Sequence, residues 1–265
     1  MYYEFLEDVA QTNRLRDVHP VIKIILGLGC ILIAVSSQSI IAPLFIVFTI
    51  SFATIFLAGI DVGLYRKLLM IPVGFAVIGV LVILFMRNSG DTVFSYPLFG
   101  SIVLTVSTGS INESLLILSR VFAGMCSLFF ISLTTPVTET FQLAAKCHIP
   151  NELIDLSMLI YRFIFVFIEQ AEQIYNAQVM RLGYGNLKEG IDCFGMMSGA
   201  LFINTWDAGE NLLRAMDSRC YDGKFALLDD DVKFSYSSFV CVIIYLIVVI
   251  AIAVATSGYT VFGVN

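Results

Sequence analysis

Long apolar stretches constrain this chain more than any other feature of its sequence. Crossing the hydrocarbon core of a bilayer takes about 20 mostly apolar residues. Five segments meet or approach that length: Val21–Ser36, Ile40–Ile60, Leu68–Met86, Ser114–Thr134 and Phe234–Thr256. Only 14% of the residues are Asp, Glu, Lys or Arg, whereas soluble domains carry about 25%. The sequence therefore predicts an all-α polytopic membrane protein with about five transmembrane helices, and it excludes soluble enzymes and disordered chains.

The basic residues predict the orientation of these spans, because they concentrate in cytoplasmic loops. All but two of the 15 lie before span one or, for Lys23, near its entrance, between spans two and three, or between spans four and five; the exceptions are Arg87 and Arg120. We therefore expect a cytoplasmic N-terminus and an external tail, Gly258–Asn265. An alternative reading makes the short apolar runs Leu156–Ile168 and Phe194–Trp206 a hairpin of spans, which would move Arg181 and Lys188 outside.

Two local features of the membrane segments also follow from the sequence. Pro43 and Pro72 are expected in the first turns of their spans, where proline is tolerated. The connection Arg87–Glu113 has a middle rich in β-branched and aromatic residues, Phe94–Val106. Such a pattern predicts either a short β-hairpin or a re-entrant piece.

About 100 residues separate spans four and five, which is too long for a turn. They divide the chain into residues 1–134, a cytoplasmic domain 135–233, and residues 234–265. Thr135 and Pro136 are typical of a helix start, and that helix should end near Cys147. A second helix is predicted from Pro150 to Leu182 and a third over Glu189–Tyr221, each with an apolar stripe at alternating spacings of three and four.

The two long helices end alike. Ala177-x3-Arg181-x3-Gly185 matches Ala215-x3-Arg219-x3-Gly223, and Tyr184 and Tyr221 follow the arginines. One interpretation is ordinary helix termination, since arginine complements the helix dipole and glycine caps the helix. The other is a pair of docking knobs for a partner with two like pockets, such as a dimeric ATPase, because guanidinium offers a planar fork of donors.

The remaining chemistry-bearing residues are sparse. No pair of the six cysteines has CxxC spacing, the two histidines are isolated, and no span clusters donors suited to Co²⁺ or Ni²⁺. The chain is therefore not expected to hold a transition-metal ion itself, and its net charge of −6 disfavours nucleic acid. Arg120 lies within a span, so its charge should face protein, water or a partner acid. A structural ion pair or a hydrogen bond to backbone is favoured over snorkelling.

Residues 134–223 resemble the transmembrane T component of energy-coupling factor transporters, the CbiQ/EcfT family. The order and spacing of several short motifs carry the resemblance. The N-terminus resembles that of the CbiQ branch, and Arg120 in span four resembles a family position. These motifs are Thr134-Thr135-Pro136, Ile149-Pro150-Asn151-Glu152-Leu153, Tyr161-Arg162-Phe163, Ala177-Gln178, Arg181-Leu182-Gly183, Ala215-Met216 and Ser218-Arg219, with Thr12-Asn13-Arg14-Leu15, His19-Pro20 and Lys23 at the N-terminus.

The resemblance implies a non-catalytic coupling subunit of an ATP-driven importer in the plasma membrane of a prokaryote. In that family, each long cytoplasmic helix ends in an Ala-Arg-Gly motif that docks on one of two ABC-type ATPase subunits. Arg181 and Arg219 match those arginines, and Ala177, Ala215 and Gly183 are the accompanying docking residues. This sequence departs from the motif at its flanks, Met180 and Leu182 in one case and Ser218 and Cys220 in the other.

The resemblance also implies the partners and the cargo. The ATPase subunits would bind ATP and Mg²⁺, so this chain would carry no cofactor. A CbiM-like S component in the membrane would bind the substrate, with a small accessory membrane protein as a further partner. The CbiQ branch implies cobalt, with nickel or a vitamin as alternatives. A stand-alone secondary transporter is disfavoured, because such proteins usually place ionisable groups at the midplane and show repeated halves. No HExxH, GxSxG or Walker A sequence is present.

Overall fold

The computed structural model describes residues 9–86, 92–99, 102–146, 149–221 and 235–257. The chain divides into two compact units. The first contains Met1–Glu139 and Asp231–Asn265, and the second contains Thr140–Asp230. Each unit is described by itself below.

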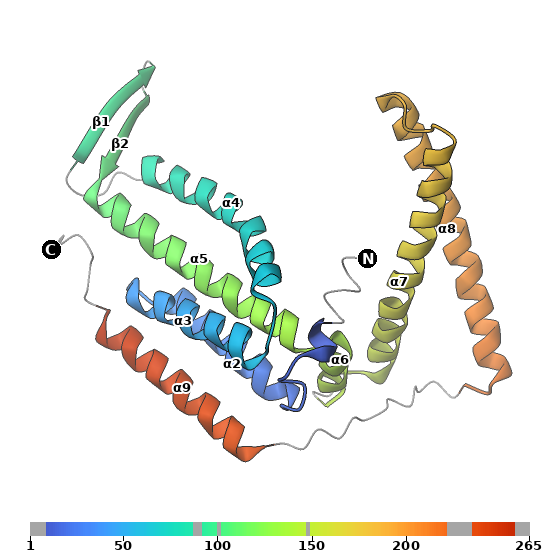
Figure 1. Cartoon of the computed structure of the whole chain (residues 1–265), viewed down its shortest axis with the longest axis horizontal. Coiled ribbons are helices and arrows are strands. Elements are labelled where there is room, and N and C mark those ends of the chain that lie inside the picture. Colours follow the sequence, from blue (N-terminus) through green and yellow to red (C-terminus); the bar gives the residue numbers. More distant parts are fainter. Residues whose placement is uncertain (1–8, 87–91, 100–101, 147–148, 222–234, 258–265) are drawn as a thin grey trace. The chain divides into compact units, whose positions relative to one another are not determined.

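The first unit is built from apolar helices (Figure 1). They are α2 (Pro20–Ser36), α3 (Ile41–Phe52), which continues as the π-helical turn η1 (Ala53–Leu57), α4 (Val62–Met86), α5 (Thr108–Thr134) and α9 (Tyr236–Ala255). Three stretches within α4, α5 and α9 are long and apolar enough to cross a membrane. The expected all-α membrane fold is confirmed. The count of five spans stays a prediction for α2 and for Ile41–Leu57, which are shorter apolar helices.

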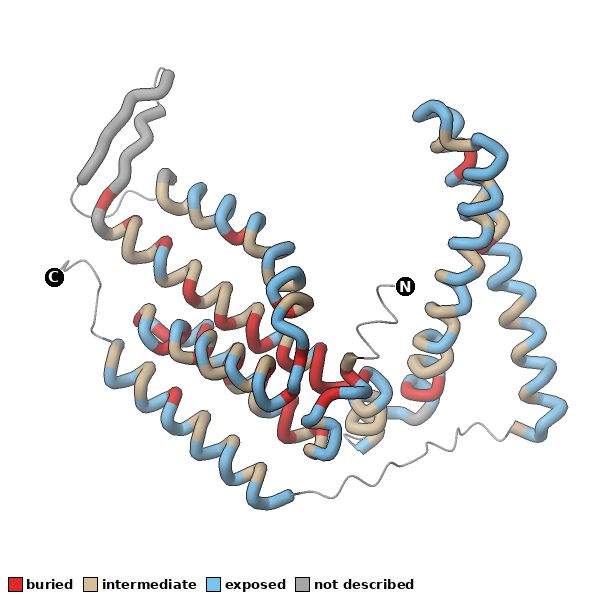
Figure 2. The backbone as a smooth tube through the Cα atoms, viewed as in Figure 1, coloured by how far each residue is buried: buried red, intermediate tan, exposed pale blue. Residues whose placement is uncertain are grey.

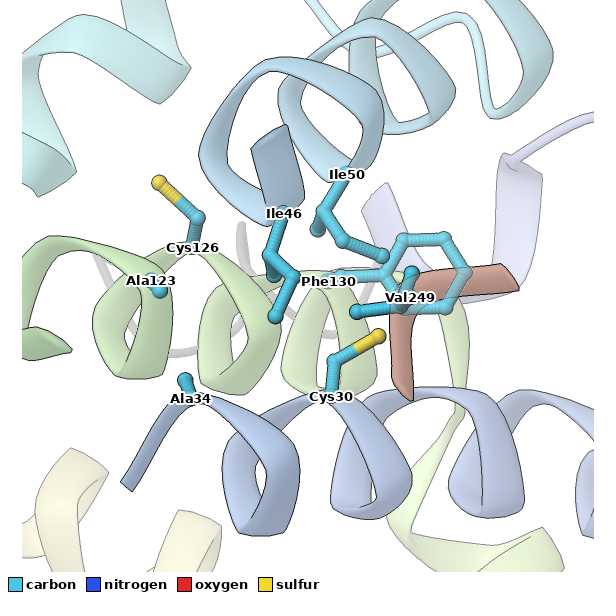
Figure 3. Close-up of a cluster of buried hydrophobic side chains, with 8 residues drawn as sticks. All are labelled: Cys30, Ala34, Ile46, Ile50, Ala123, Cys126, Phe130 and Val249. Carbon is cyan, nitrogen blue, oxygen red and sulfur yellow. The ribbon is translucent and has the colours of Figure 1, made fainter. Parts of the chain in front are cut away.

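Helix α5 lies at the centre of the first unit, with α2, α3 and α4 packed against it. Helix α9 packs on α2 and α3. Figure 3 shows side chains from α2, α3, α5 and α9 meeting in one apolar cluster of small and β-branched residues around Phe130. The cluster consists of Cys30, Ala34, Ile46, Ile50, Ala123, Cys126, Phe130 and Val249.

Two glycines let α2 approach its neighbours closely. A Cβ on Gly27 would lie 2.5 Å from Cδ1 of Ile131 on α5, and still closer to its Cγ1. A Cβ on Gly29 would lie 2.9 Å from a methyl of Leu246 on α9. Helix α2 is therefore held between α5 and α9 by contacts at its own backbone, the packing mode that small residues allow between membrane helices.

Helix α4 corrects one expectation from the sequence. The helix begins at Val62, six residues before the predicted start of the span. Pro72 therefore lies inside α4 and not in its first turn. An interior proline removes one backbone hydrogen bond and crowds the preceding turn, and α4 is visibly bent along its length in Figure 1.

The connection between α4 and α5 forms the predicted hairpin. Strands β1 (Thr92–Phe99) and β2 (Ile102–Ser107) pair antiparallel, with Thr92 opposite Ser107. Ser107 then caps α5: its Oγ accepts from the backbone N–H of Ser110 at 3.2 Å, and Ser110 Oγ accepts from the N–H of Ser107 at 3.0 Å. This reciprocal capping satisfies donors that a helix start leaves unpaired.

The second unit is a long antiparallel helical hairpin. Helix α7 (Asn151–Met180) and helix α8 (Leu187–Ser218) pack together, preceded by α6 (Val137–Lys146), which begins in the first unit. The predicted helices are thus present, with ends that differ by a few residues. Figure 2 shows few buried positions along either long helix. Those in α7 and α8 are Ile154, Asp155, Cys193 and Leu201.

Candidate functional site

The end of α7 is a tight turn that presents Arg181. The backbone N–H of Leu182 donates to the carbonyl of Val179 at 3.0 Å, and that of Gly183 donates to Gln178 at 3.0 Å. This pair of bonds is the Schellman motif, which satisfies carbonyls that the last helical turn leaves without partners. It requires a left-handed residue after the cap, and Leu182 has φ 59°.

The end of α8 repeats this geometry around Arg219. The N–H of Cys220 donates to Asp217 at 3.1 Å, and the N–H of Tyr221 donates to Met216 at 3.1 Å. Cys220 has φ 55°. The match between the two helix ends therefore extends from the sequence to the backbone, and each end places an arginine at the cap position.

Leu182 and Cys220 occupy the positions where the resembled motif has glycine. A residue with a Cβ pays about 1–2 kcal/mol in the left-handed region, whereas glycine enters it freely. We expect Leu182→Gly and Cys220→Gly each to stabilise the folded chain by about 1 kcal/mol. Thermal unfolding of the purified variants measures this.

The matched control is Leu213→Gly, an exposed leucine in the interior of α8. It should lose about 1 kcal/mol, because glycine is a poor residue in a helix interior. Equal losses at all three positions would show that the two caps do not have this geometry.

The turn between α7 and α8 is fastened by side chains from both helices. Gln178 Nε2 donates to the carbonyl of Cys193 at 2.9 Å, and the Tyr184 hydroxyl donates to Gln178 Oε1 at 2.8 Å. Cys193 Sγ donates to the carbonyl of Gly183 at 3.2 Å. A Cβ on Gly183 would lie 2.6 Å from this sulfur. The close approach of α8 therefore requires glycine there, whatever its role in docking.

Tyr184 remains a hydrogen-bond donor in this turn. Desolvation raises the pKa of its phenol above the usual value, and Cys193 and Tyr175 raise it further. The Tyr175 and Tyr184 rings lie 5.1 Å apart between centroids. The neutral phenol is therefore the form present at physiological pH, and the turn that carries Arg181 keeps this bond.

The second tip is held to the opposite end of the hairpin. The Tyr221 hydroxyl lies 3.4 Å from Oδ2 of Asp155, a buried residue in the second turn of α7. Arg219 thus lies near the beginning of α7, and Arg181 lies at its end. Since α7 has 30 residues, the two tips are separated by about 45 Å along the helix axis.

Both arginine side chains are available to a partner. Arg181 and Arg219 are exposed, and neither guanidinium is hydrogen-bonded to another residue that the structure describes. Ala177 and Ala215, one turn earlier on each helix, are also exposed. The structure therefore gives each tip the same order, an exposed alanine and then an exposed arginine, and does not bring the two tips together.

An apolar groove of about 300 Å³ lies between α7 and α8. Thr205 and Ala208 line it from α8, and the α7 side supplies Ile160, Phe163, Ile164, Val166, Phe167, Ile168 and Gln170. On α8, the large side chains Phe194, Phe202 and Trp206 are exposed. Exposed apolar surface on this scale is typical of a protein or membrane interface.

Arg120, in the middle of α5, is hydrogen-bonded to backbone. Its Nε donates to the carbonyl of Ser37 at 3.0 Å, and its Nη2 donates to the same oxygen. Ser37 caps α2, so the guanidinium pairs with an orphan carbonyl at a helix end. Nearby in the chain, Ser39 Oγ donates to Thr256 Oγ1 at 2.9 Å and connects this corner to the end of α9.

Sequence reasoning did not single out Asp155. Its signal is weak, a carboxylate in the second turn of an apolar helix, and its partner Tyr221 lies 66 residues away. Asn13 was noted only as a motif residue, and Lys23 as a motif residue and a basic residue near the entrance of span one; the structure places both against the end of α5. Within the described ranges, no group of three or more His, Cys, Asp and Glu side chains is arranged to hold a metal ion.

Comparison with known proteins places this architecture in a family. The model of the CbiQ family, described as cobalt transport protein, matches residues 11–227. A protein of Methanocorpusculum labreanum described as a fused cobalt transport protein, CbiMQ, is 44% identical over 226 residues, which are 85% of this chain. This chain spans only 38% of that fused protein.

Two further relatives match over most of their own lengths. An uncharacterized protein of Methanocaldococcus jannaschii is 35% identical over 98% of this chain and 96% of its own length. The cobalt transport protein CbiQ of Salmonella typhimurium is 26% identical over 59% of this chain and 70% of its length. With its apolar helices and a family match over most of its residues, the chain is a membrane protein that belongs to the CbiQ family of cobalt transport proteins.

Proposed function

We propose that this chain is the transmembrane coupling subunit of an ATP-driven importer. It connects two ABC-type ATPase subunits to a substrate-binding membrane protein and carries out no catalysis itself. The observation that carries the proposal is the pair of like helix ends, each an identical backbone turn with an exposed arginine at its cap. Two such ends on one chain suit a partner that presents the same pocket twice.

The geometry of the hairpin supports docking on two separate subunits. Because α7 and α8 are antiparallel, Arg181 and Arg219 lie at opposite ends, about 45 Å apart along α7. One pocket could not receive both. A guanidinium can form two parallel hydrogen bonds to a carboxylate or bind backbone carbonyls. Each arginine would therefore enter one pocket of an ATPase dimer, and closure of that dimer on ATP would move the two ends relative to each other.

The partner in the membrane is inferred from the fused relative. Its name joins CbiM and CbiQ in one polypeptide, and a fusion keeps two proteins adjacent. We assign recognition of the cargo to a CbiM-like S component, with Co²⁺ as the substrate and nickel or a vitamin as alternatives. The apolar surface around Phe194, Phe202 and Trp206 would face that component or the lipid headgroup region. The arginine-bearing hairpin is then cytoplasmic, in the plasma membrane of a prokaryote.

Reconstitution tests this function. The chain is co-expressed with its ATPase pair and the CbiM-like protein, purified as a complex and placed in proteoliposomes. Uptake of radioactive Co²⁺ should require ATP on the side of the membrane where the ATPase subunits lie. It should also require every one of the partner proteins. Omission of the chain should abolish uptake while each remaining protein is still present. Uptake by the chain alone, driven by an ion gradient, would instead identify a secondary transporter.

A further inference from the structure

We propose that the N-terminus clamps the end of α5 and that this clamp transmits movement of the coupling hairpin to the membrane helices. The N-terminal clamp consists of Val9–Val18 together with Lys23. The inference rests on the proposed coupling function and adds to it the residues through which movement enters the membrane unit. All of the contacts involved lie within the first unit.

Lys23 is the most informative member, because it is a buried cation on an apolar helix. Its side chain is only 2% exposed. Its Nζ donates to the carbonyl of Thr134 at 3.0 Å, and the carboxylates of Asp17 and Glu139 act on it electrostatically. Burying an ammonium is costly unless it is paired. The buried ammonium of Lys23 is therefore stabilised by its contact with Thr134, the last residue of α5. A cation at this helix end also complements the helix dipole.

Asn13 binds the same helix end from the N-terminal segment. It is buried, and its Nδ2 lies 3.3 Å from the carbonyls of both Leu133 and Thr134 and 2.6 Å from that of Ala10. The last carbonyls of a helix have no intrahelical partner. Asn13 and Lys23 supply donors to them from two different parts of the chain, so the end of α5 is prevented from fraying.

The clamp also connects α5 to the helix pair α3 and α4. The N–H of Arg14 donates to the carbonyl of Ala58 at 3.1 Å. Gly59, with φ 73°, passes so close that a Cβ there would lie 3.3 Å from Arg14 Cδ. Leu15 packs into a cluster of buried residues from all these elements. That cluster is Ala58, Ile60, Tyr65 and Leu133. Three helix ends are therefore joined through the N-terminal segment.

The position of the clamp gives it a mechanical role. Helix α6 begins at Val137, three residues after α5 ends at Thr134, and the chain continues from there into the hairpin. The hairpin is connected along the chain to the first unit twice, through α6 and ahead of α9, and movement that passes through α6 reaches the membrane helices at Thr134. If that end is fixed, the movement is passed to α5, α3 and α4 together. If it is free, the last turn of α5 unwinds locally and absorbs the movement.

The test measures the number of Co²⁺ ions imported per ATP hydrolysed by the full complex in proteoliposomes. Lys23→Met keeps the length of the side chain and removes its charge and donors. We expect this ratio to fall about 2- to 30-fold, the range of typical coupling effects, with ATP hydrolysis and complex yield maintained. Lys23→Arg, which keeps a charged donor, should preserve the ratio. Lys67→Met, an exposed lysine on α4, is the control and should also preserve it.

Asn13→Ala is a second, milder variant, in which the ratio of Co²⁺ imported to ATP hydrolysed should also fall. It tests the clamp if Lys23→Met does not fold. An unchanged ratio in the folded variant would overturn the clamp. The experiment distinguishes failure of the clamp proposal from failure of the proposed function. If the wild-type chain did not bind ATPases, the coupling role itself would be wrong. If wild-type uptake were normal and the Lys23→Met and Asn13→Ala ratios were unchanged, only the clamp would be wrong.

Discussion

Replacing both tip arginines by glutamate is expected to release the ATPase subunits from this chain. Arg181 and Arg219 are exposed caps of matched turns, and each would insert its guanidinium into an acceptor-lined pocket. Removing one partner of a buried interfacial charge pair costs about 2–5 kcal/mol, which corresponds to roughly a 30- to 5,000-fold loss of affinity. Reversal of the charge adds repulsion against the same acceptors. The double variant should therefore lose the complex during purification.

Single variants separate the contributions of the two ends. Under the proposed function the two tips would bind one ATPase dimer, and each would then raise the effective concentration of the other. Arg181→Glu or Arg219→Glu alone should retain a weakened complex, and the double variant should lose it. The measurement is co-purification of the ATPase pair, followed by binding of the detergent-solubilised chain to immobilised ATPases.

Arg214→Glu is the matched control for these reversals. Arg214 lies on α8, is exposed, and forms a salt bridge with Glu210 at 3.0 Å. Exposed pairs of this kind contribute at most about 1 kcal/mol. The control chain should bind ATPases normally despite the same change in net charge as each single reversal. A double variant that still assembled and imported Co²⁺ at the wild-type rate would disprove docking through the arginines.

Gly27→Ala is expected to destabilise the membrane unit strongly for the size of the change. The added methyl would overlap the Ile131 side chain and would lie 3.3 Å from the carbonyl oxygen of Ser127. Overpacking a close helix contact typically costs about 1–3 kcal/mol. Here the overlap lies in the contact between α2 and α5, two of the helices that contribute side chains to the central cluster. The thermal unfolding midpoint of the detergent-solubilised chain should fall.

Two companion variants make this result specific. Gly124→Ala, on α5, adds the same methyl where nothing lies within 4 Å, so it should leave the midpoint unchanged or raise it. Ile131→Ala in the Gly27→Ala background removes the side chain that the methyl meets. The two changes should therefore be less harmful together than the sum of their separate effects. Equal losses for Gly27→Ala and Gly124→Ala would argue against the α2–α5 contact.

The apolar runs located the membrane helices well, because hydropathy depends mainly on local composition. The main error was α4. Its first residues include Arg66 and Lys67, so a hydropathy criterion starts the span too late, and Pro72 then falls inside the helix. Helical periodicity likewise placed α7 and α8, with ends shifted by a few residues. Proline and helix caps influence only about one helical turn. The predictions from hydropathy and from periodicity were therefore inaccurate only near the ends of the helices.

The contacts that define the candidate site depended on pairs distant in the chain. For Arg120 the sequence favoured a structural ion pair or a hydrogen bond to backbone. The structure shows the backbone bond, but its acceptor Ser37 is 83 residues away. No local pattern identifies such a partner. Lys23 was interpreted as a basic residue at the entrance of a span, whereas it is buried against Thr134, 111 residues away. The substitutions Leu182 and Cys220 were visible in the sequence, but their left-handed backbone was not.

The corner formed by Arg120, Ser37 and Ser39 has a consequence for the surrounding lipids. Helix α2 has 17 residues, so the apolar wall it presents is about 25 Å tall. A typical hydrocarbon core is about 30 Å thick. If α2 crosses the bilayer, as the sequence predicts, the acyl chains beside it should compress to keep the polar corner in the headgroup region, at a cost of fractions of a kcal/mol per Å of mismatch. The bilayer around this protein is expected to be locally thin on that side, and shorter-chain lipids should gather there.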